Sequence, residues 1–244
     1  MSCQLALVID LNKCVGCHAC AVNCKSWNTS GQFGPLTEES PYGKEPDGVW
    51  FNRVQTYEVG VFPGVDVVHL PKSCMHCVDA PCVGVCPTGA SHKRAEDGIV
   101  LVDYDECIGC KYCSWACPYG CREFDFHEGV MKKCTLCVDR IYDESLPEEM
   151  RKPACVIACP TGARIFGDVN DPASEAGRAI LEKQGYQMMP ESGANPANHY
   201  LPHRRSTYDI QSDRITVLRG AMATARPADG KPTIGYEDHS STSG

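Results

Sequence analysis

The chain has 244 residues, 18 of them cysteine, and 31 Asp and Glu against 23 Lys and Arg give it a net charge of −8. This acidic balance excludes nucleic acid as the expected partner. No apolar run approaches the roughly 18 residues of a membrane span, so we expect a chain that is soluble by itself and contacts a membrane only through a partner.

The first predicted elements are a strand and a helix. Leu5 to Asp10 alternates apolar and small residues like a strand, and Val15 to Cys24 passes through a loop into a short helix. Residues 27–72 then form an insertion, a loop followed by a β-hairpin. The hairpin strands are expected at Val49 to Val59 and Val65 to Leu70, joined by a turn that contains Gly and Pro.

Fewer elements are expected in the second part of the chain. Asp97-Gly98 is a turn into a strand from Ile99 to Val102, and Asp171 to Gln184 is predicted to be a helix with Pro172 in its first turn. Beyond Met188 the chain is rich in Pro, Gly, Asn and Ser. Because apolar side chains persist in the segment from Asn195 to Ala223, we expect this arm to become ordered against a larger partner.

Sixteen of the cysteines form four motifs, and the last three motifs end in Cys-Pro. The third motif has the C-x2-C-x2-C-x3-C spacing of bacterial ferredoxins, which the first shares, while the second and fourth have longer middle gaps. The motifs are Cys14, Cys17, Cys20 and Cys24; Cys74, Cys77, Cys82 and Cys86; Cys107, Cys110, Cys113 and Cys117; and Cys134, Cys137, Cys155 and Cys159.

Disulfides and zinc are the competing interpretations of so many cysteines. Disulfide frameworks belong to short secreted chains, whereas this chain is long and begins without a signal-like segment. Structural zinc uses two separated C-x2-C pairs, and a C-x2-C-x2-C-x3-C run would leave it with surplus ligands. Four repeats of the ferredoxin spacing therefore favour four [4Fe-4S] clusters.

The composition is consistent with a fold held by metal. Leu, Ile, Val and Phe make up 47 of the 244 residues, about 19%, which is near the level at which a chain often fails to build a core. Metal binding contributes folding free energy where the site does not exist in the unfolded chain. We therefore expect the metal-free chain to be unfolded or molten, and the clusters to be inserted in a reducing cytoplasm.

The motifs are expected to work in pairs, because the fourth cysteine of a ferredoxin motif ligates the neighbouring cluster. The second and third motifs are adjacent in the chain, which leaves the first and fourth to pair with each other. The sequence Cys-Pro-Thr-Gly-Ala follows both the second and the fourth motif, so an internal duplication is visible. The predicted ligand sets are Cys14, Cys17, Cys20 and Cys159; Cys24, Cys134, Cys137 and Cys155; Cys74, Cys77, Cys82 and Cys117; and Cys86, Cys107, Cys110 and Cys113.

These motifs, their nested pairing and the hairpin insertion resemble the iron–sulfur subunit of membrane-bound molybdopterin oxidoreductases. That family includes dimethyl sulfoxide, polysulfide, thiosulfate and tetrathionate reductases and the cytoplasmic membrane-bound sulfite dehydrogenase. The resemblance covers roughly residues 3 to 170, and Tyr200-Leu201-Pro202 is similar to the tails of these subunits. The opening Gln4 to Asn12 and the run Cys14 to Cys20 look most like the sulfite dehydrogenase branch.

The resemblance implies an α+β fold of two ferredoxin-like two-cluster halves related by pseudo-symmetry, with a β-hairpin insertion and an extended C-terminal arm. The implied domains are residues 1–26 with 127–170, 27–72, 73–126 and 171–244. The subunit would be non-catalytic. It would carry electrons from a molybdopterin catalytic subunit, which holds a further [4Fe-4S] cluster, to a quinone-reactive multi-span membrane anchor.

Carried over to the matching positions of this chain, the route implied by the resemblance would run from the Cys14 cluster through the Cys134 and Cys74 clusters to the Cys107 cluster. Relatives with tryptophan in the third motif hold a [3Fe-4S] cluster there, whereas Cys110 at this position implies four cubanes. The complex is expected on the inner face of the cytoplasmic membrane, since no twin-arginine signal is present. The favoured activity is sulfite oxidation with quinone as acceptor. The alternatives are the same relay in a quinol-dependent reductase, and a free-standing polyferredoxin or hydrogenase partner.

Residues outside the motifs carry weaker expectations. Cys3 and Cys121 are expected to be structural thiols, the histidines near the motifs are not expected to be ligands, and Trp27, Trp50 and Trp115 are expected to be packing residues. Each cation near a motif has two equally weighted interpretations. It either raises the reduction potential of a neighbouring cluster or is a solvated surface charge. The histidines are His18, His69, His76 and His127, and the cations are Lys111, Arg122, Lys132 and Lys133.

Overall fold

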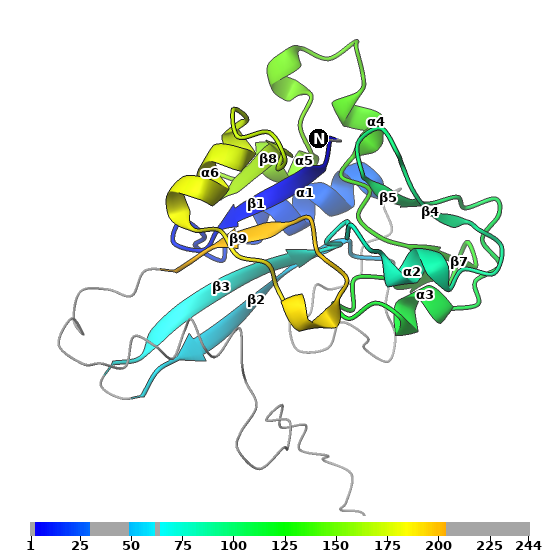
Figure 1. Ribbon diagram of the computed structural model, residues 1–244, viewed down its shortest axis with the longest axis horizontal. Coiled ribbons are helices and arrows are strands. Elements are labelled where there is room, and N and C mark those ends of the chain that lie inside the picture. The colour runs from blue at the N-terminus through cyan, green and yellow to red at the C-terminus, as the bar shows by residue number, and fades with distance from the viewer. Residues whose placement is uncertain (1–2, 30–48, 62–63, 204–244) are drawn as a thin grey trace, which may run out of the picture. The chain divides into compact units, whose positions relative to one another are not determined.

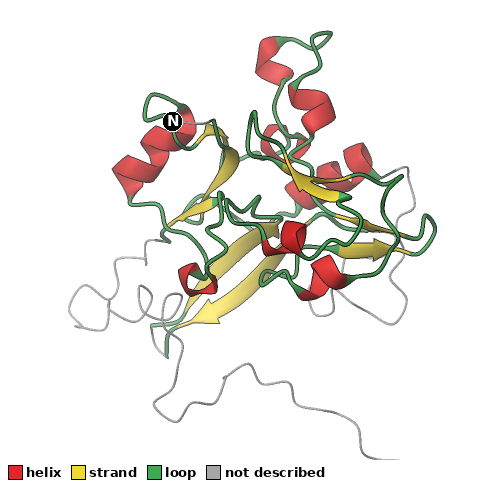
Figure 2. Cartoon of the chain, turned by 45° about the vertical axis from the view of Figure 1, so that its right-hand side comes forward, coloured by secondary structure: helices red, strands yellow, loops and turns green. Residues whose placement is uncertain are grey.

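Short helices and short paired strands, joined by long loops, make up the fold (Figures 1 and 2). The structure is a computed structural model, and it describes residues 3–29, 49–61 and 64–203. The strands are β1 Leu5–Asp10, β2 Asn52–Val59, β3 Asp66–Ser73, β4 Ser91–Lys93, β5 Val100–Val102, β6 Glu123–Asp125, β7 Val130–Lys132, β8 Arg164–Asp168 and β9 His199–Leu201. The helices are α1 Ala19–Asn28, α2 Pro81–Gly84, α3 Tyr112–Trp115, α4 Val138–Ile141, α5 Ala154–Ile157 and α6 Glu175–Lys183, with 3-10 turns η1 Glu148–Met150 and η2 Pro190–Ser192.

The first strand is the centre of a three-stranded sheet with the order β8-β1-β9. β8 pairs antiparallel to β1, with Leu7 opposite Phe166, and β9 pairs parallel to it. Helix α6 packs on this sheet, and Val8, Ala176 and Leu201 are buried between them. The predicted strand Leu5 to Asp10 is confirmed at its predicted ends.

Helix α6 begins later than the sequence predicts. The expected helix starts at Asp171 with Pro172 in its first turn, but Ser174 is the N-cap and its hydroxyl accepts from the Gly177 amide at 2.9 Å. A serine hydroxyl in this position satisfies an amide that has no partner within the helix. Pro172 therefore lies before the helix, and that part of the prediction was wrong.

The expected hairpin strands pair antiparallel as β2 and β3, with Asn52 opposite Ser73 and Val59 opposite Asp66. The inward side chains of Val54, Val68 and Leu70 are buried, as the alternation of a half-buried ribbon requires. β3 continues to Ser73, immediately before the first cysteine of the second motif. The hairpin thus leads the chain directly into that motif.

Each of the motif helices carries the third cysteine of its motif. Cys20, Cys82, Cys113 and Cys155 lie on α1, α2, α3 and α5. α1 packs on α5, and α2 packs on α3, as Figure 1 shows. The predicted strand Ile99 to Val102 is β5, which begins at Val100 and forms a small hairpin with β4, and β6 pairs with β7 in the same way.

The segment after Met188 differs from the expectation of an arm ordered only by a partner. Tyr200 and Leu201 are buried within this chain, and the Tyr200 hydroxyl donates to the Pro71 carbonyl at 2.9 Å. The segment up to residue 203 is therefore ordered by its own chain, because a parallel pairing with β1 satisfies its backbone. Residues 204–223 of the expected arm lie outside the described residues.

Buried thiols form part of the core. The largest cluster of buried side chains mixes Leu7, Ile9 and Tyr200 with cysteines from the motifs, Cys20, Cys24, Cys74, Cys77, Cys134 and Cys155.

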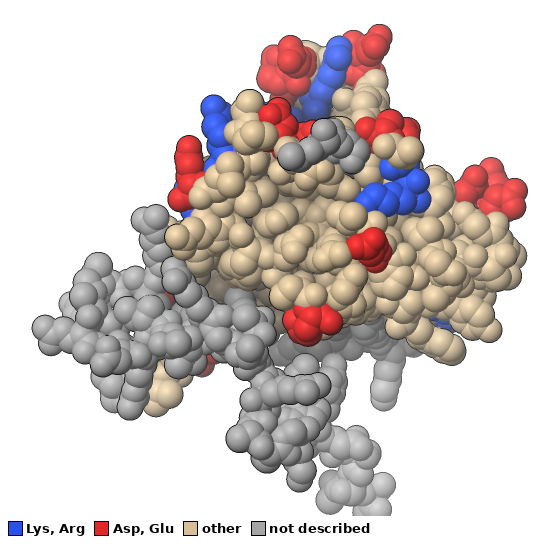
Figure 3. All heavy atoms as spheres, viewed as in Figure 1, with Lys and Arg blue, Asp and Glu red and all other residues tan. Residues whose placement is uncertain are grey.

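All described residues belong to one compact unit. None of the helices in the described ranges is long and apolar enough to cross a membrane. On the face in Figure 3, charged side chains gather toward the upper edge and a broad uncharged area lies below them.

Candidate metal centres

Two hollows in the structure are lined by cysteines from different motifs. The first is lined by Cys14, Cys17, Cys20 and Cys159, which we call set one. The second is lined by Cys86, Cys107, Cys110 and Cys113, which we call set four. In each set one cysteine is the fourth of the partner motif, as the exchange of fourth ligands requires.

The other eight motif cysteines form two more groups. Burial and then the charges of Cys134, Cys155 and Cys137 raise the pKa of Cys24, so these four thiols, set two, are neighbours. Burial and then the charges of Cys74, Cys82 and Cys117 raise the pKa of Cys77 to about 12, which defines set three. The structure thus brings together the same four groups that the spacing predicts. Iron ligation by them stays a prediction.

The four sets follow one another in a row. Cys20 of set one is among the charges that raise the pKa of Cys155 in set two, after burial and Cys137. The pKa of Cys134 in set two is likewise raised by burial, then by the charge of Cys155, and then by the charge of Cys74 from set three. Sets three and four meet where α2 packs on α3. Sets one and four are therefore the ends of the row, and Cys17 of set one is exposed.

The cysteine loops depend on backbone conformations that favour glycine. Gly16 and Gly109, each just before the second cysteine of its motif, have φ of +67°. A Cβ at Gly109 would lie 2.4 Å from the Gly129 carbonyl oxygen, and one at Gly16 would lie 2.5 Å from the His69 ring. A side chain at either position would therefore be strained and would crowd a neighbour, although the equivalent positions before Cys77 and Cys137 hold His76 and Leu136 at φ of +45° and +54°. The turns that result direct successive thiols toward a common centre.

Backbone amides point at the sulfurs of several motif cysteines. The amides of Ser91 and Ala163 donate to Cys86 at 3.4 Å and Cys159 at 3.2 Å, in equivalent turns. Three further amides donate to sulfur at 3.4 Å, Met131 to Cys107, Leu136 to Cys134 and Ala154 to Cys137. Amide donors around sulfur stabilise thiolates and are one of the factors that set cluster potentials.

Burial favours the protonated form of most of the buried thiols. Burial raises the pKa of Cys134 to about 12 and that of Cys155 to about 11. Cys117 is the opposite case, since hydrogen bonding from the Cys121 thiol lowers its pKa to about 5. The Cys121 thiol also donates to the Ser73 carbonyl at 3.1 Å. Metal binding must therefore release protons as it converts thiols to thiolates.

The donors fit a polynuclear cluster better than a single ion. Among the described residues, no three His, Cys, Asp or Glu side chains are placed to hold one metal ion. A zinc site would need four ligands converging on one centre, whereas a cubane keeps its four thiolates farther apart. Two buried arginine nitrogens beside the sets, Arg122 Nη1 and Arg164 Nε, also find no hydrogen-bond acceptor in the described part. An anionic iron–sulfur cluster would supply acceptors at both places.

The predicted cations are in different surroundings. Lys111 is exposed, with its ammonium 4.1 Å from the Phe124 ring centroid. Lys132 forms ion pairs with Asp125 and Glu128. The buried Lys133 donates to the carbonyl of Cys134 at 2.8 Å and to that of Val100.

Arg122 reaches a thiol, with Nη2 donating to Cys82 Sγ at 3.0 Å. A second buried arginine, Arg164, is not among the predicted cations, and its Nη1 donates to Cys155 Sγ at 3.5 Å. The signal that could have found it is the sequence Cys-Pro-x-Gly-x-Arg. It occurs at Cys117–Arg122 and again at Cys159–Arg164.

The side chains around the sets have structural partners. Buried His76 accepts from the Val100 amide at 3.1 Å, and burial lowers its pKa. Burial and a hydrogen bond with Asp168 raise the pKa of Cys3 to about 11. Trp115 is 80% exposed, so the expectation that it packs within this chain was wrong. Its helix α3 has only four residues and packs through Cys113.

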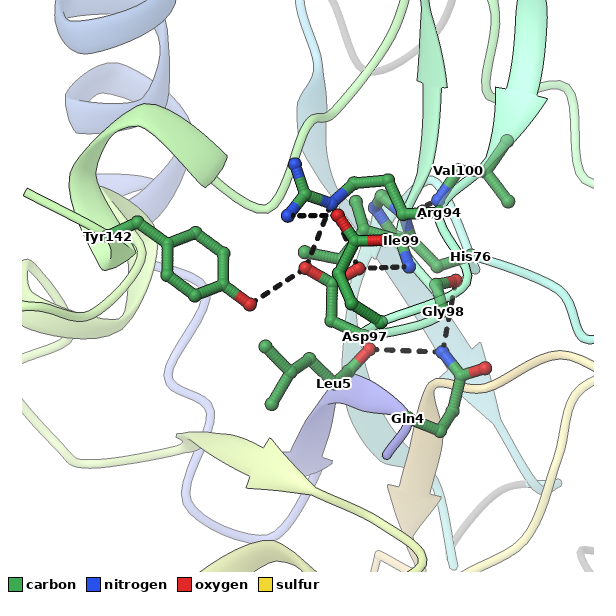
Figure 4. A network of polar contacts seen from close by, with 10 residues as sticks. Gln4, Leu5, His76, Arg94, Asp97, Gly98, Ile99, Val100 and Tyr142 are labelled. Carbon is green, nitrogen blue, oxygen red and sulfur yellow. Dashed lines mark hydrogen bonds and ion pairs between the residues drawn. The ribbon is translucent and has the colours of Figure 1, made fainter. Parts of the chain in front are cut away.

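A buried carboxylate joins the turn between β4 and β5 to β1 and to the residue that follows α4 (Figure 4). Asp97, in the turn between β4 and β5, accepts from Arg94 Nε at 3.0 Å, from the Ile99 amide at 3.0 Å and from the Tyr142 hydroxyl at 2.8 Å. Its carbonyl accepts from the Leu5 amide of β1 at 2.9 Å. Tyr142 follows α4, which begins just after Cys137. The network therefore links the segment after Cys137 of set two to β1 and to the β4–β5 turn.

Comparisons with known proteins all find similarity to iron–sulfur proteins or to subunits of oxidoreductases. Residues 65–169 match the family described as a 4Fe-4S dicluster domain. The chain is 64% identical over 213 residues to a subunit of the sulfite dehydrogenase of Allochromatium vinosum, covering 87% of this chain and 89% of that protein. It is 38% identical over 217 residues to the putative dimethyl sulfoxide reductase iron-sulfur subunit of Halobacterium salinarum, covering 80% and 78%. It is 35% identical over 247 residues to the arsenate respiratory reductase iron-sulfur subunit of a Shewanella species, covering 81% and 96%.

Proposed function

Because the chain belongs to the family of iron–sulfur electron-transfer subunits of multi-subunit oxidoreductases, we propose that it conducts electrons through four [4Fe-4S] clusters. The ligands are sets one to four, sixteen cysteines in all. The clusters run between a molybdopterin catalytic subunit, with its own [4Fe-4S] cluster, and a quinone-reactive multi-span membrane anchor. When bound, each cluster takes up and gives back one electron.

The observation that carries this proposal is the row of four thiol sets. Each set contains four thiols, and neighbouring sets are close enough for their charges to interact. The sets at the ends of the row reach the surface in hollows, and nearly all thiols of the sets between them are buried. A row with two accessible ends suits electron transfer between two partners. The proposal includes the division into halves, residues 1–26 with 127–170 and residues 73–126.

Exposed apolar side chains around set four support a partner at that end. Ile108 is 66% exposed, Phe126 is 64% exposed, and Trp115 lies on α3 beside Cys113. Contiguous apolar side chains on a surface mark interaction sites. We assign this end to the membrane anchor and set one to the catalytic subunit. The proposal includes a location on the inner face of the cytoplasmic membrane.

Sulfite is the proposed substrate of the catalytic partner, and quinone is the proposed acceptor. The support is the higher identity to the sulfite dehydrogenase subunit, 64%, compared with 38% and 35% for the two reductase subunits. In this direction electrons enter at set one and leave at set four. A quinol-dependent reductase would use the same row in reverse.

The test uses the assembled complex with Cys107→Ser in this chain. The expected result is that sulfite still reduces the catalytic subunit while quinone reduction falls at least about tenfold, because an end of the row is interrupted. Stopped-flow absorbance measures the first step, and steady-state quinone reduction measures the second. Cys3→Ser, a thiol outside the four sets that hydrogen-bonds to Asp168, is the matched control and should reduce quinone normally. Normal quinone reduction by the Cys107→Ser complex would overturn the assigned exit.

A further inference from the structure

We propose that two buried arginines, Arg122 and Arg164, set the cluster potentials in pairs, each acting on the two thiol sets between which it lies. Arg122 would act on sets three and four, and Arg164 on sets one and two. The inference rests on the proposed function, since it requires clusters at the four sets.

The two arginines occupy equivalent places in the chain. Each lies five residues after the last cysteine of its motif, in Cys117–Arg122 and Cys159–Arg164. Within these turns Gly120 and Gly162 have φ of +60° and +62°. Arg122 immediately precedes β6, and Arg164 begins β8. The same turn therefore brings a guanidinium back over the cysteines in both places.

Arg122 lies between sets three and four. It is 1% exposed, and its Nη2 donates to Cys82 Sγ at 3.0 Å and to the Ser91 hydroxyl at 2.6 Å. Burial opposes its charge, but the thiolates of Cys82 and Cys113 outweigh this and raise its pKa. Cys82 belongs to set three and Cys113 to set four.

Arg164 has the matching position between sets one and two. It is 3% exposed, and its Nη1 donates to Cys155 Sγ at 3.5 Å while Nη2 donates to Asn52 Oδ1 at 2.6 Å. Burial opposes its charge, but the thiolates of Cys155 and Cys20 raise its pKa. Cys155 belongs to set two and Cys20 to set one. In both places the guanidinium lies between the third cysteines of two paired motifs.

In the described part of the chain, neither arginine has a carboxylate as counter-charge. Within residues 3–29, 49–61 and 64–203, no ion pair to Asp or Glu includes Arg122 or Arg164. A buried charge without a partner costs several kcal/mol, roughly. The thiolates and the clusters they ligate are the anions that offset this cost. Arg122 Nη1 and Arg164 Nε, which have no acceptor in the same ranges, are available to donate to them.

The sign of the effect follows from charge. A cubane held by four thiolates is an anion, and reduction adds one negative charge to it. A fixed cation nearby stabilises the reduced form more than the oxidised form, and so raises the potential. Because both guanidinium groups are buried, solvent screens this attraction less than it would at the surface.

The experiment is a redox titration of the full chain in its complex, followed by electron paramagnetic resonance. Arg122→Gln should lower two of the four potentials, each by at least a tenfold change in the reduction equilibrium, about 59 mV. Arg164→Gln should lower the other two. Arg→Lys at either place should restore part of the shift, since it keeps the charge. Lys111→Gln is the matched control, because Lys111 is exposed and adjoins the ligand Cys110, and it should leave all four potentials in place.

A second variant tests the charge without removing the arginine. Asn52→Asp places a carboxylate on Arg164 Nη2, and it should lower the same two potentials as Arg164→Gln. It covers the case in which Arg164→Gln fails to fold. Variants that hold about sixteen irons with all four potentials unmoved, or with all four moved equally, would overturn the inference alone. A wild-type chain with about eight irons would overturn the proposed function and the inference with it.

Discussion

Cys20 and Cys24 lie one turn apart on α1 but belong to different thiol sets. Cys20 lines the hollow of set one, and Cys24 is a neighbour of Cys134, Cys137 and Cys155 in set two. The spacing predicts this division, because a residue one turn further along a helix projects from a different point along its axis. The division of α1 between two sets is what joins the first motif to the fourth.

Replacing these two cysteines one at a time is a matched test of ligand exchange. Cys24→Ser should remove or convert the cluster of set two, and Cys20→Ser the cluster of set one, because each serine deletes one thiolate from a different set. Electron paramagnetic resonance of the reduced proteins would show a different signal altered in each variant. The exchange is contradicted if both variants alter the same cluster.

The buried arginines show where single residues escape prediction. Arg122 is a candidate in the sequence because it lies beside a motif, yet nothing in one motif distinguishes a buried guanidinium from a solvated one. Arg164 escapes prediction for the same reason. Its burial depends on Asn52 from the distant hairpin, which accepts from its Nη2. The equivalent place of the two arginines is seen only when the third and fourth motifs are compared with each other.

At the scale of elements, periodicity predicts β1 and the β2–β3 hairpin, because these strands are long enough to alternate. The three-residue strand β9 was not predicted, since Pro, Gly and Asn surround it and its order comes from pairing with β1. The four-residue helices α2, α3 and α5 have no period of their own. They were not predicted, and each contains the third cysteine of its motif and ends before the fourth.

The Asp97 network offers a test of how elements are held together. Asp97→Ala removes the acceptor of Arg94, Tyr142 and the Ile99 amide, and buried donors left unpaired should cost about 3 kcal/mol. The expected result is a lower urea concentration for loss of the visible iron–sulfur absorbance. Glu96→Ala is the control, because Glu96 also pairs with Arg94 but its side chain is 60% exposed. Such exposed pairs contribute little. Equal midpoints for the two variants would contradict the role given to Asp97.

At the scale of the whole molecule, apolar side chains and thiols share one core. Leu7 and Ile9 of β1 lie in the same buried cluster as thiols from three of the motifs. The low content of large apolar residues predicts such dependence on metal. Composition does not predict that two guanidinium groups are buried without an ion pair to a carboxylate in the described part of the chain.

Removing the iron should therefore unfold the chain rather than leave an empty scaffold. Without clusters, burial holds thiols such as Cys134, with a pKa of about 12, in the neutral form, so Arg122 and Arg164 lose the anions that offset their burial. The clusters also cease to contribute their binding free energy to folding. After chelation under anaerobic, thiol-reducing conditions, near-ultraviolet circular dichroism and the cooperative thermal transition should both be lost. The control is the same treatment with chelator already saturated with iron. A metal-free chain that keeps a cooperative transition at the original temperature would show that apolar packing alone holds the fold.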